Sequence, residues 1–410
     1  MTLTIHKAVA MLMMTTSLWA TKLHAQTWAP KKNIPSGNFD GAAIFSAGGD
    51  IYMGGGLYTN AIMEYDTLAN TWVSKTSMPG MLITTRAGAS GFTINDTGYI
   101  AFGYDQDPIT MGEIDLTDLW QYNKAGNSWV RKQDFPPVHW YKRLGTMFVA
   151  NGKAYFPGGY DSGTASKQLW QYDPVTNAWS QKHDLPVGIY GALTFTLGSK
   201  GYLSFCDLDS GATNFVFEYD AVADTWTRKN DMPAPRRIGP AAFVIDGHAF
   251  AGLGSFYDGA IHVFNDLYLY NQAADSWTAV DTTPLIGTYI TETVSMGNKA
   301  FVGGGKNINT GAYSKEWYEV TSAMFSGIAD VSMPHRISCY PNPTTDAITI
   351  TGAPDCKSGC SCNIINTCGS VVGHKIWTGG KIETNNIPPG HYLLELSAGT
   401  EKYVTVFEMR

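Results

Sequence analysis

LWQYDPVTNAWSQKHDLP, residues 169–186, contains the pattern that decides the fold, because its tryptophan and proline return six times at a constant separation of 7 residues. The six pairs are Trp28 and Pro35, Trp72 and Pro79, Trp129 and Pro136, Trp179 and Pro186, Trp226 and Pro233, and Trp277 and Pro284. Successive tryptophans lie 44, 57, 50, 47 and 51 residues apart. A fixed period of about 50 residues indicates a repeat architecture.

Each period contains four short strand signals, which are clearest between residues 144 and 186. The alternating segments of this unit are residues 146–149, 154–156, 169–173 and 177–179. Asn151-Gly152 marks a tight turn after the first segment, and Gly158-Gly159 ends the second. Four antiparallel strands in a period of about 50 residues predict one blade of a β-propeller.

The unit resembles the Kelch repeat, in which paired glycines follow the second strand and an aromatic third strand precedes the tryptophan. This resemblance covers roughly residues 27–321. The predicted glycine pairs are Gly54-Gly55, Gly158-Gly159 and Gly303-Gly304, with departures at Phe102-Gly103, Gly252-Leu253-Gly254 and Phe205-Cys206. The resemblance implies an all-β fold, a six-bladed Kelch-type β-propeller.

The two ends of the repeat region complete one another. The unit from Tyr289 to Val320 has three strand signals but no tryptophan–proline pair, whereas the pair at Trp28 and Pro35 has no strands before it. We therefore predict that the N-terminal segment supplies the outer strand of the last blade, which leaves no open sheet edge. The propeller is then one domain over residues 26–322.

The chain begins with a segment typical of a secretory signal peptide. Lys7 precedes the apolar residues 8–14, and Ala25 is a small residue suited to a cleavage site. The alternative, a membrane anchor, is disfavoured because hydroxyl residues at 15–17 interrupt this short run. We expect a signal peptide over residues 1–25, a secreted protein, and no membrane insertion of the mature chain.

A second domain follows a linker over residues 323–337. Its short strands predict a small C-terminal β-sandwich over residues 338–410. Tyr340-Pro341-Asn342-Pro343-Thr344 opens it, and Gly390-His391-Tyr392 lies near its end. These motifs resemble the type A C-terminal sorting domain of the Bacteroidetes type IX (Por) secretion system. The resemblance implies the type IX secretion machinery as a partner and export across the outer membrane to the cell surface or the medium.

Charge and cysteine content restrict the partners and the compartment. The net charge is −7, and it becomes −9 without Lys7 and Lys22 of the signal segment. Such a surface disfavours nucleic acid and anionic membranes as partners. Five of the six cysteines lie in the last domain, at positions 339, 356, 360, 362 and 368. Zinc binding and disulfides both remain open, and an oxidising compartment favours disulfides.

Candidate ligand-binding residues gather where the segments that enter the inner strands converge, at the mouth of the central channel. Alignment of the blades on their first strands gives Asp40, Arg86, Arg143, Tyr190, Arg236, Arg237, Tyr289 and Glu292. Arginines from three blades could grip an anionic group such as a sugar carboxylate, since a guanidinium binds a carboxylate with two parallel hydrogen bonds. The alternative is that these residues are the solvated rim of a scaffold.

The sequence contains none of the nucleophile-elbow, zinc-protease or phosphate-loop motifs. We therefore predict a secreted or surface-displayed binding module for a glycan or a protein, with no catalytic residue, metal or cofactor. The alternatives come from other Kelch-like propellers. One is a carbohydrate-active enzyme of the sialic acid mutarotase type, in which Arg86, Arg143, Arg237 and Glu292 would handle the sugar. The other is a copper oxidase that resembles galactose oxidase.

Overall fold

The computed structural model describes residues 26–35, 41–56, 59–78, 86–106, 109–110, 112–136, 140–141, 146–161, 164–204, 207–208, 211–280, 283–285, 288–289, 291–307, 310–322, 338–340, 344–351, 360–366, 371–379, 381–398 and 401–409. The chain divides into two compact units, residues 1–322 and 323–410. The expected signal peptide and linker lie outside the described residues. Within the described part, no helix is long and apolar enough to cross a membrane.

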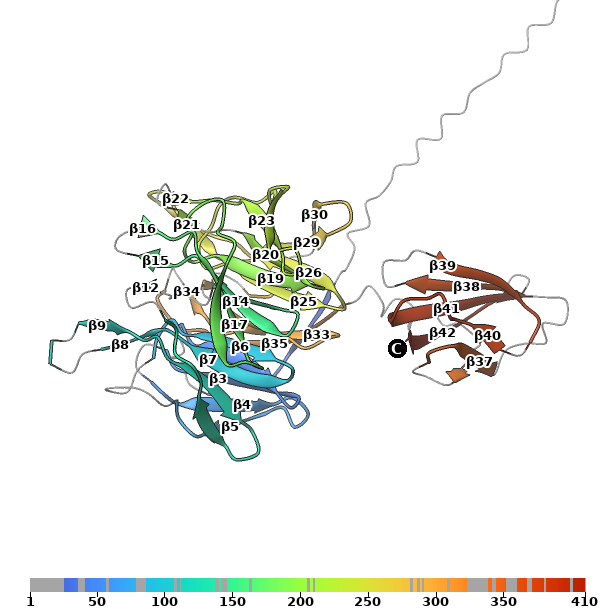
Figure 1. Cartoon of the computed structure of the whole chain (residues 1–410), viewed down its shortest axis with the longest axis horizontal. Coiled ribbons are helices and arrows are strands. Elements are labelled where there is room, and N and C mark those ends of the chain that lie inside the picture. The colour runs from blue at the N-terminus through green and yellow to red at the C-terminus, as the bar shows by residue number, and fades with distance from the viewer. Residues whose placement is uncertain are drawn as a thin grey trace, which may run out of the picture. The chain divides into compact units, whose positions relative to one another are not determined.

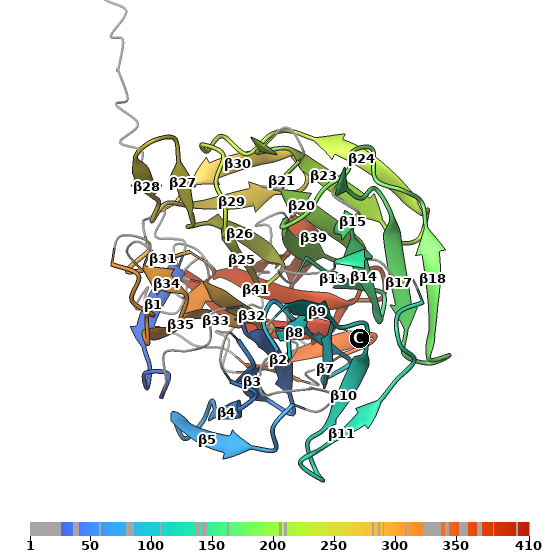
Figure 2. The ribbon, with the colours of Figure 1, turned by 90° about the vertical axis from the view of Figure 1, so that its left-hand side faces the viewer.

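Six four-stranded antiparallel sheets form the blades of the first unit, and Figure 2 shows them arranged around a central axis. From the innermost strand outwards, blade 1 contains β2 (Ala43–Ala47), β3 (Asp50–Gly54), β4 (Ile62–Asp66) and β5 (Thr71–Lys75). Blade 2 contains β6 (Ser90–Ile94), β7 (Thr97–Ala101), β10 (Leu119–Asn123) and β11 (Ser128–Arg131). Blade 3 contains β13 (Phe148–Ala150), β14 (Lys153–Pro157), β17 (Leu169–Asp173) and β18 (Ala178–Lys182).

The second half of the ring repeats this order. Blade 4 contains β19 (Leu193–Leu197), β20 (Lys200–Ser204), β23 (Val216–Asp220) and β24 (Thr225–Lys229). Blade 5 contains β25 (Ala241–Ile245), β26 (His248–Gly252), β29 (Leu267–Asn271) and β30 (Ser276–Ala279). Blade 6 contains β32 (Glu292–Ser295), β33 (Lys299–Gly303), β35 (Trp317–Ser322) and β1 (Gln26–Pro30).

The N-terminal strand closes the ring, as the sequence predicts. β1 pairs antiparallel with β35, and Trp28 lies opposite Val320. The inner strands contact one another in the order β2, β6, β13, β19, β25 and β32, and β32 contacts β2 again. The last blade therefore contains strands from both ends of the propeller segment, and this pairing closes the ring of blades.

Aromatic side chains fill the space between the blades. In five blades a phenylalanine of the innermost strand stacks on an aromatic ring of the second strand, as Phe45 does on Tyr52 with ring centroids 5.1 Å apart. The tryptophans of the repeated tryptophan–proline pairs pack on tyrosines of the third strand. The ring centroids of Trp179 and Tyr172, for example, are 5.2 Å apart. Each aromatic ring buries a large apolar area, so the repeat period appears in the core as well as in the sequence.

A polar clamp joins neighbouring blades at five places. In blade 3, Asn177 Oδ1 accepts hydrogen bonds from the Tyr172 hydroxyl at 2.8 Å and from the Gln133 N–H of the preceding blade's exit segment at 3.0 Å. Trp179 Nε1 donates to the Gln133 carbonyl at 2.8 Å. The residues equivalent to Asn177 are Asn70, Asn127, Asp224 and Asp275. All five have positive φ, which Asn and Asp tolerate better than most residues.

The aspartate of the blade 4 clamp should make stability depend on acid. Burial alone would raise the pKa of Asp224, but hydrogen bonds from the Tyr219 hydroxyl and the His183 N–H outweigh it and lower that pKa. A carboxyl group with a lowered folded-state pKa stabilises the protein above its unfolded value of about 4, and this stability is lost as the pH falls through the folded pKa.

We therefore expect Asp224→Asn to cost about 1 kcal/mol of unfolding free energy at pH 7, since charged hydrogen bonds are stronger than neutral ones. The cost should shrink as the pH falls through the lowered pKa of Asp224, and it should vanish where the carboxyl group is protonated in both states. The matched variant is Asn177→Asp, which should gain acid dependence in blade 3. Denaturant unfolding from pH 7 to pH 3 is the measurement, and parallel curves for wild type and Asp224→Asn would contradict this assignment.

The structure corrects the position of the glycine pair in two blades. The residues with positive φ are Gly55-Gly56 and Gly304-Gly305, one position later than the sequence predicts. A Cβ atom on Gly55 would lie 2.5 Å from the Arg86 carbonyl oxygen, so the close approach of two segments requires glycine there. Phe102 and Leu253 occupy the first position of the pair in blades 2 and 5, with φ of 60° and 59°.

Short hairpins extend one face of the propeller, and we call this the hairpin face. Most of these hairpins connect the second strand of a blade to its third strand, and the others pair with such a connection. Because the strands are antiparallel, all of these connections lie at the same end of the blades. Figure 1 shows β8, β9, β15, β16, β21 and β22 on one side. The strands are β8 (Tyr104–Gln106), β9 (Glu113–Asp115), β12 (Trp140–Tyr141), β15 (Tyr160–Asp161), β16 (Thr164–Ala165), β21 (Asp207–Leu208), β22 (Gly211–Ala212), β27 (Ser255–Tyr257), β28 (Ile261–Val263), β31 (Thr288–Tyr289) and β34 (Lys306–Asn307).

The second unit consists of two antiparallel sheets. One contains β36 (Ser338–Tyr340), β37 (Ala347–Thr351) and β40 (Lys381–Glu383), and the other contains β39 (Val371–Trp377), β38 (Cys360–Asn366), β41 (Gly390–Ala398) and β42 (Glu401–Met409), each in this spatial order. Ile348 and Ile382 of the first sheet pack in one core with Leu394 of the second. Cys360 is disulfide-bonded, and Cys362 is a buried thiol whose pKa is raised by desolvation.

Candidate ligand site at the hairpin face

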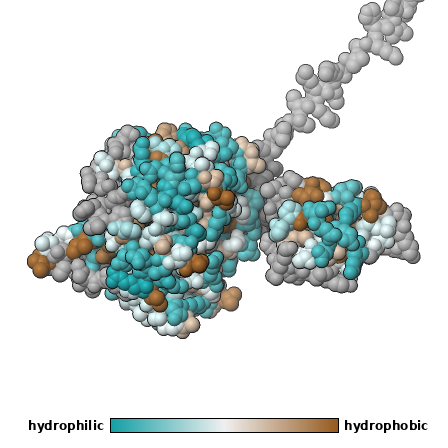
Figure 3. Space-filling model, in the orientation of Figure 1, coloured by the Kyte–Doolittle hydropathy of each residue, from teal (hydrophilic) through white to brown (hydrophobic). Residues whose placement is uncertain are grey.

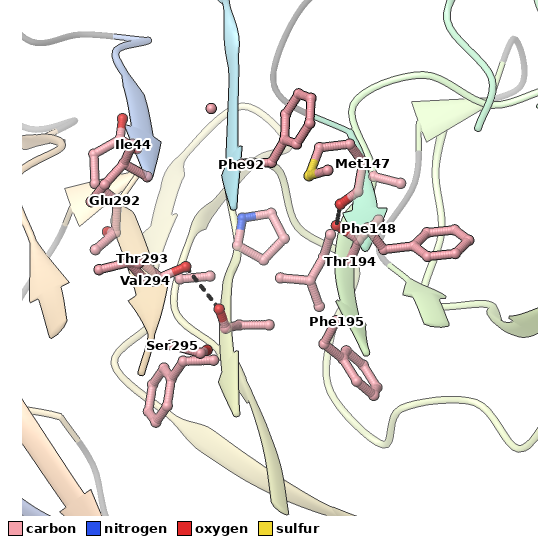
Figure 4. A pocket seen from close by; sticks show the side chains of 18 of the residues that line it. Ile44, Phe92, Met147, Phe148, Thr194, Phe195, Glu292, Thr293, Val294 and Ser295 are labelled. Carbon is pink, nitrogen blue, oxygen red and sulfur yellow. Dashed lines mark hydrogen bonds between the residues drawn. The ribbon is translucent and has the colours of Figure 1, made fainter. Parts of the chain in front are cut away.

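The six inner strands enclose a central channel with a cavity volume of about 600 Å³. Figure 4 shows side chains around it, among them Ile44 of β2, Thr194 of β19 and Thr293 of β32. Glycine, alanine, serine, threonine and aliphatic residues dominate the wall, because the inner strands converge and leave room only for small side chains. Among the described residues that line the channel, Glu292 is the one that carries a charge. The channel wall therefore offers few groups for binding an ion.

Hydroxyl groups of the channel wall bind the backbone of neighbouring blades. Thr93 Oγ1 donates to the Ser46 carbonyl at 2.9 Å, and Thr293 Oγ1 donates to the Ala242 carbonyl at 2.8 Å. Thr194 Oγ1 donates to the Met147 carbonyl in the same way. These bonds join blades 1 and 2, 5 and 6, and 3 and 4. These hydroxyls thus join neighbouring blades, and their hydrogen atoms are already donated to backbone carbonyls.

Two of the predicted arginine clamps are buried ion pairs. Arg86 is 0% exposed, and its guanidinium binds Asp118 Oδ2 at 2.7 Å. Arg237 is also 0% exposed and binds both carboxylate oxygens of Asp266, with Nη2 3.0 Å from Oδ2. The expectation that these side chains line solvent is wrong, because each has an aspartate on the connection that precedes the third strand of its own blade.

Both arginines also hold the backbone of the hairpin face. Arg86 Nη1 donates to the Phe102 carbonyl at 3.0 Å, and Arg237 Nη1 donates to the Leu253 carbonyl at 2.9 Å. Phe102 and Leu253 are the residues that replace glycine at a positive φ. A positive φ costs an ordinary side chain about 1–2 kcal/mol. The buried ion pairs therefore sit where they can offset this strain and anchor the hairpins of blades 2 and 5.

The other predicted residues have different surroundings. Tyr190 packs edge-on against Tyr160, with ring centroids 5.2 Å apart. Arg236 is exposed and lies 4.7 Å above the Phe256 ring, while Glu292 is 8% exposed and lines the channel. Tyr289 lies on β31, which pairs with β34. Asp40 and Arg143 lie outside the described residues. The structure thus brings Tyr190, Arg236 and Glu292 to the hairpin face or its channel.

The candidate site residues from the sequence leave out a set of aromatic residues on the hairpins. Tyr160 on β15 is 38% exposed, and Tyr257 on β27 is 66% exposed. On blade 6, Lys306 Nζ lies 5.3 Å from the centre of the Tyr313 ring. The available signal was position, since Tyr160 directly follows a glycine pair and Tyr257 comes three residues after Gly254. An aromatic residue there must begin the hairpin rather than the third strand.

Comparison with known proteins agrees with this architecture. Residues 338–407 match the family model of the secretion system C-terminal sorting domain, and residues 146–185 match that of the Kelch motif. The chain is a Kelch-type propeller with a type IX secretion sorting domain. The solved structure titled "Structure of YjhT" is similar to it, with a TM-score of 0.62 and 19% identity, over 71% of this chain and 99% of that chain. No curated protein matches the sequence.

The sorting domain indicates where the Kelch propeller is transported. It supports export of this chain across the outer membrane, and it implies an interaction with the type IX secretion machinery. Within the described residues of the propeller and the sorting domain, no group of three or more His, Cys, Asp or Glu side chains is placed to hold a metal ion. The hairpin face of the Kelch propeller carries aromatic rings, the exposed guanidinium of Arg236, and the exposed pair of His262 and Asp258, and the Glu292 carboxylate lines the channel.

Proposed function

We propose that the exported Kelch propeller binds a carbohydrate at its hairpin face, with the exposed aromatic rings as the stacking surface. The observation that carries this proposal is that Tyr160, Tyr190 and Tyr257 lie on connections at the same face, where Tyr160 packs edge-on against Tyr190 and Tyr257 is 66% exposed. Tyrosine combines a flat apolar ring with a polar edge and loses little conformational entropy on binding. These properties suit a sugar, which has an apolar face of C–H groups and a rim of hydroxyls.

Two charged groups extend the range of sugars that fit. The exposed Arg236 is held over the Phe256 ring, and a guanidinium in this position can donate two parallel hydrogen bonds to a sugar carboxylate. The Glu292 carboxylate lines the channel and can accept hydrogen bonds from sugar hydroxyls. Neutral sugars and uronic or sialic acids are both accommodated by this arrangement. Arg86 and Arg237 have no direct part in it, since their ion pairs are buried.

Screening of residues 26–410 on an array of neutral and acidic oligosaccharides tests the proposal. We expect retention on the array, and at least a tenfold loss for Tyr160→Ala/Tyr257→Ala, since truncation of one central tyrosine at an interface costs more than about 1 kcal/mol. Leu68→Ala is the matched control, because Leu68 is 95% exposed on a turn at the opposite end of blade 1. Equal retention of the double variant and the wild type would contradict the aromatic site.

The same preparation distinguishes the alternatives. Retention of a protein but of no glycan would favour a protein-binding module. If the wild type accelerates exchange between the anomers of a retained reducing sugar, as seen by NMR, and Glu292→Gln abolishes that acceleration, the mutarotase alternative is favoured. Glu292 is the feature that supports this alternative, because it is a carboxyl group in the channel of the Kelch propeller.

A further inference from the structure

The sorting domain has one sheet edge that the described chain leaves open. β39 is the terminal strand of its sheet and pairs only with β38 among the described strands. At the other end of that sheet, β42 contacts β36, and Met409 forms a parallel bridge to Thr344. An edge strand presents a row of backbone N–H and C=O groups to any strand that approaches it. β39 is therefore the edge available for pairing.

Exposed apolar side chains of the sorting domain gather on the same strand. Val371 is 55% exposed, Val372 is 42% exposed and Ile376 is 65% exposed. All large hydrophobic residues described as exposed in this unit belong to β39. Figure 3 shows hydrophobic surface at the edge of the unit where β39 lies. Proteins usually protect a strand of this kind with charges or proline. β39 carries Lys375, but this side chain bonds to β40, so it leaves the exposed valines and isoleucine without a charge among them.

The side chains beside β39 continue this surface across the sheet. Ile365 lies opposite Val371, and Leu393 lies opposite Ile365 on β41. Both Ile365 and Leu393 are half-buried. On the other side of the strand, Lys375 Nζ donates to the Glu383 carbonyl of β40 at 2.8 Å, which ties the edge to the second sheet. β39 thus offers a fixed backbone edge with an apolar row on its outer face.

We propose that β39 is the surface by which the type IX secretion machinery recognises this chain, through addition of an extended segment of a machinery component to the open edge. The sorting domain implies a partner in that machinery. Strand addition suits such a partner, because backbone hydrogen bonds give affinity and contacts with the exposed side chains of Val371 and Ile376 give specificity. The proposal concerns export and is independent of carbohydrate binding by the propeller.

Full-length chains in a bacterium with a functioning type IX system provide the test. Val371→Lys/Ile376→Lys places charges on the open edge, where surface substitutions seldom change stability by more than about 0.5 kcal/mol. We expect the amount outside the outer membrane to fall at least tenfold, with the chain accumulating in the periplasm and an unchanged melting temperature. Val222→Lys is the control, since Val222 is 78% exposed on a turn of the propeller and should leave export unchanged.

A photo-crosslinking amino acid at position 376 gives a second test that does not depend on the double variant surviving in the periplasm. We expect adducts that mass spectrometry assigns to a component of the type IX machinery, and none from the same group at position 222. Export of the double variant at the level of the wild type would overturn the proposal. Adducts of position 376 with a second copy of the chain, and with no machinery component, would overturn it as well.

Discussion

Deletion of residues 26–35 should remove most of the stability of the propeller. β1 supplies the outer strand of blade 6, and Trp28 packs against Phe243 of blade 5 and against Tyr318, with ring centroids 6.0 Å apart in both cases. Ile34, 2% exposed, is lost with it. Loss of one large buried side chain costs about 3–5 kcal/mol, so the deletion should cost roughly 5–10 kcal/mol. The melting temperature should fall by roughly 10–20 °C.

A peptide with the sequence of residues 26–35 is the matching control. Because it binds only the folded ring, it should restore the melting temperature of the deleted protein in proportion to the logarithm of its concentration. A peptide with Trp28→Ala should restore much less. Differential scanning calorimetry gives all three results. A deleted protein that melts like the wild type would contradict closure of the ring by β1.

Arg237→Ala should strongly destabilise the propeller. It removes a fully buried guanidinium and leaves Asp266 without its ion-pair partner and the Leu253 carbonyl without a donor. Breaking a buried ion pair by removal of one partner costs about 3–5 kcal/mol. Asp266 is 30% exposed in its side chain, so water can solvate it partly and we expect the lower end of this range.

The neighbouring residue is a matched control for this prediction. Arg236 is exposed, so Arg236→Ala should change the unfolding free energy by about 0.5 kcal/mol or less. Arg237→Lys should recover little stability, because an ammonium cannot form the two parallel bonds of a guanidinium. Denaturant titration of the three variants is the measurement. Equal stability of Arg236→Ala and Arg237→Ala would show that the buried pair does not hold the fold.

The repeat pattern predicts the fold because the interactions that build each blade are local in sequence. The tyrosine of the third strand and the tryptophan of the fourth, such as Tyr172 and Trp179, meet within one hairpin. The pairing of β1 with β35 is also predictable, because the last repeat lacks a fourth strand and the N-terminal segment supplies one strand without the other three. The glycine pair is misplaced by one residue in blades 1 and 6, because alternation does not specify which residue takes a positive φ.

The candidate site is less predictable, since it depends on partners that are distant in sequence. Arg86 suggests an exposed charge until Asp118, 32 residues later, is placed beside it. Tyr160 and Tyr257 resemble the core tyrosines in composition, and only the hairpins that carry them put their rings in solvent. The local sequence records the residue types, whereas the exposure of each side chain follows from how the connections fold over the channel.

Hydrogen exchange measured with and without a retained oligosaccharide tests the central claim most directly, because it locates the binding surface on the whole chain. We predict slower amide exchange on the hairpins at residues 160–165 and 255–263 when the oligosaccharide is bound. The turns at residues 66–71 and 173–178, at the opposite end of the blades, should exchange at unchanged rates. Protection confined to those turns, or to residues 338–409 of the sorting domain, would contradict a carbohydrate site at the hairpin face.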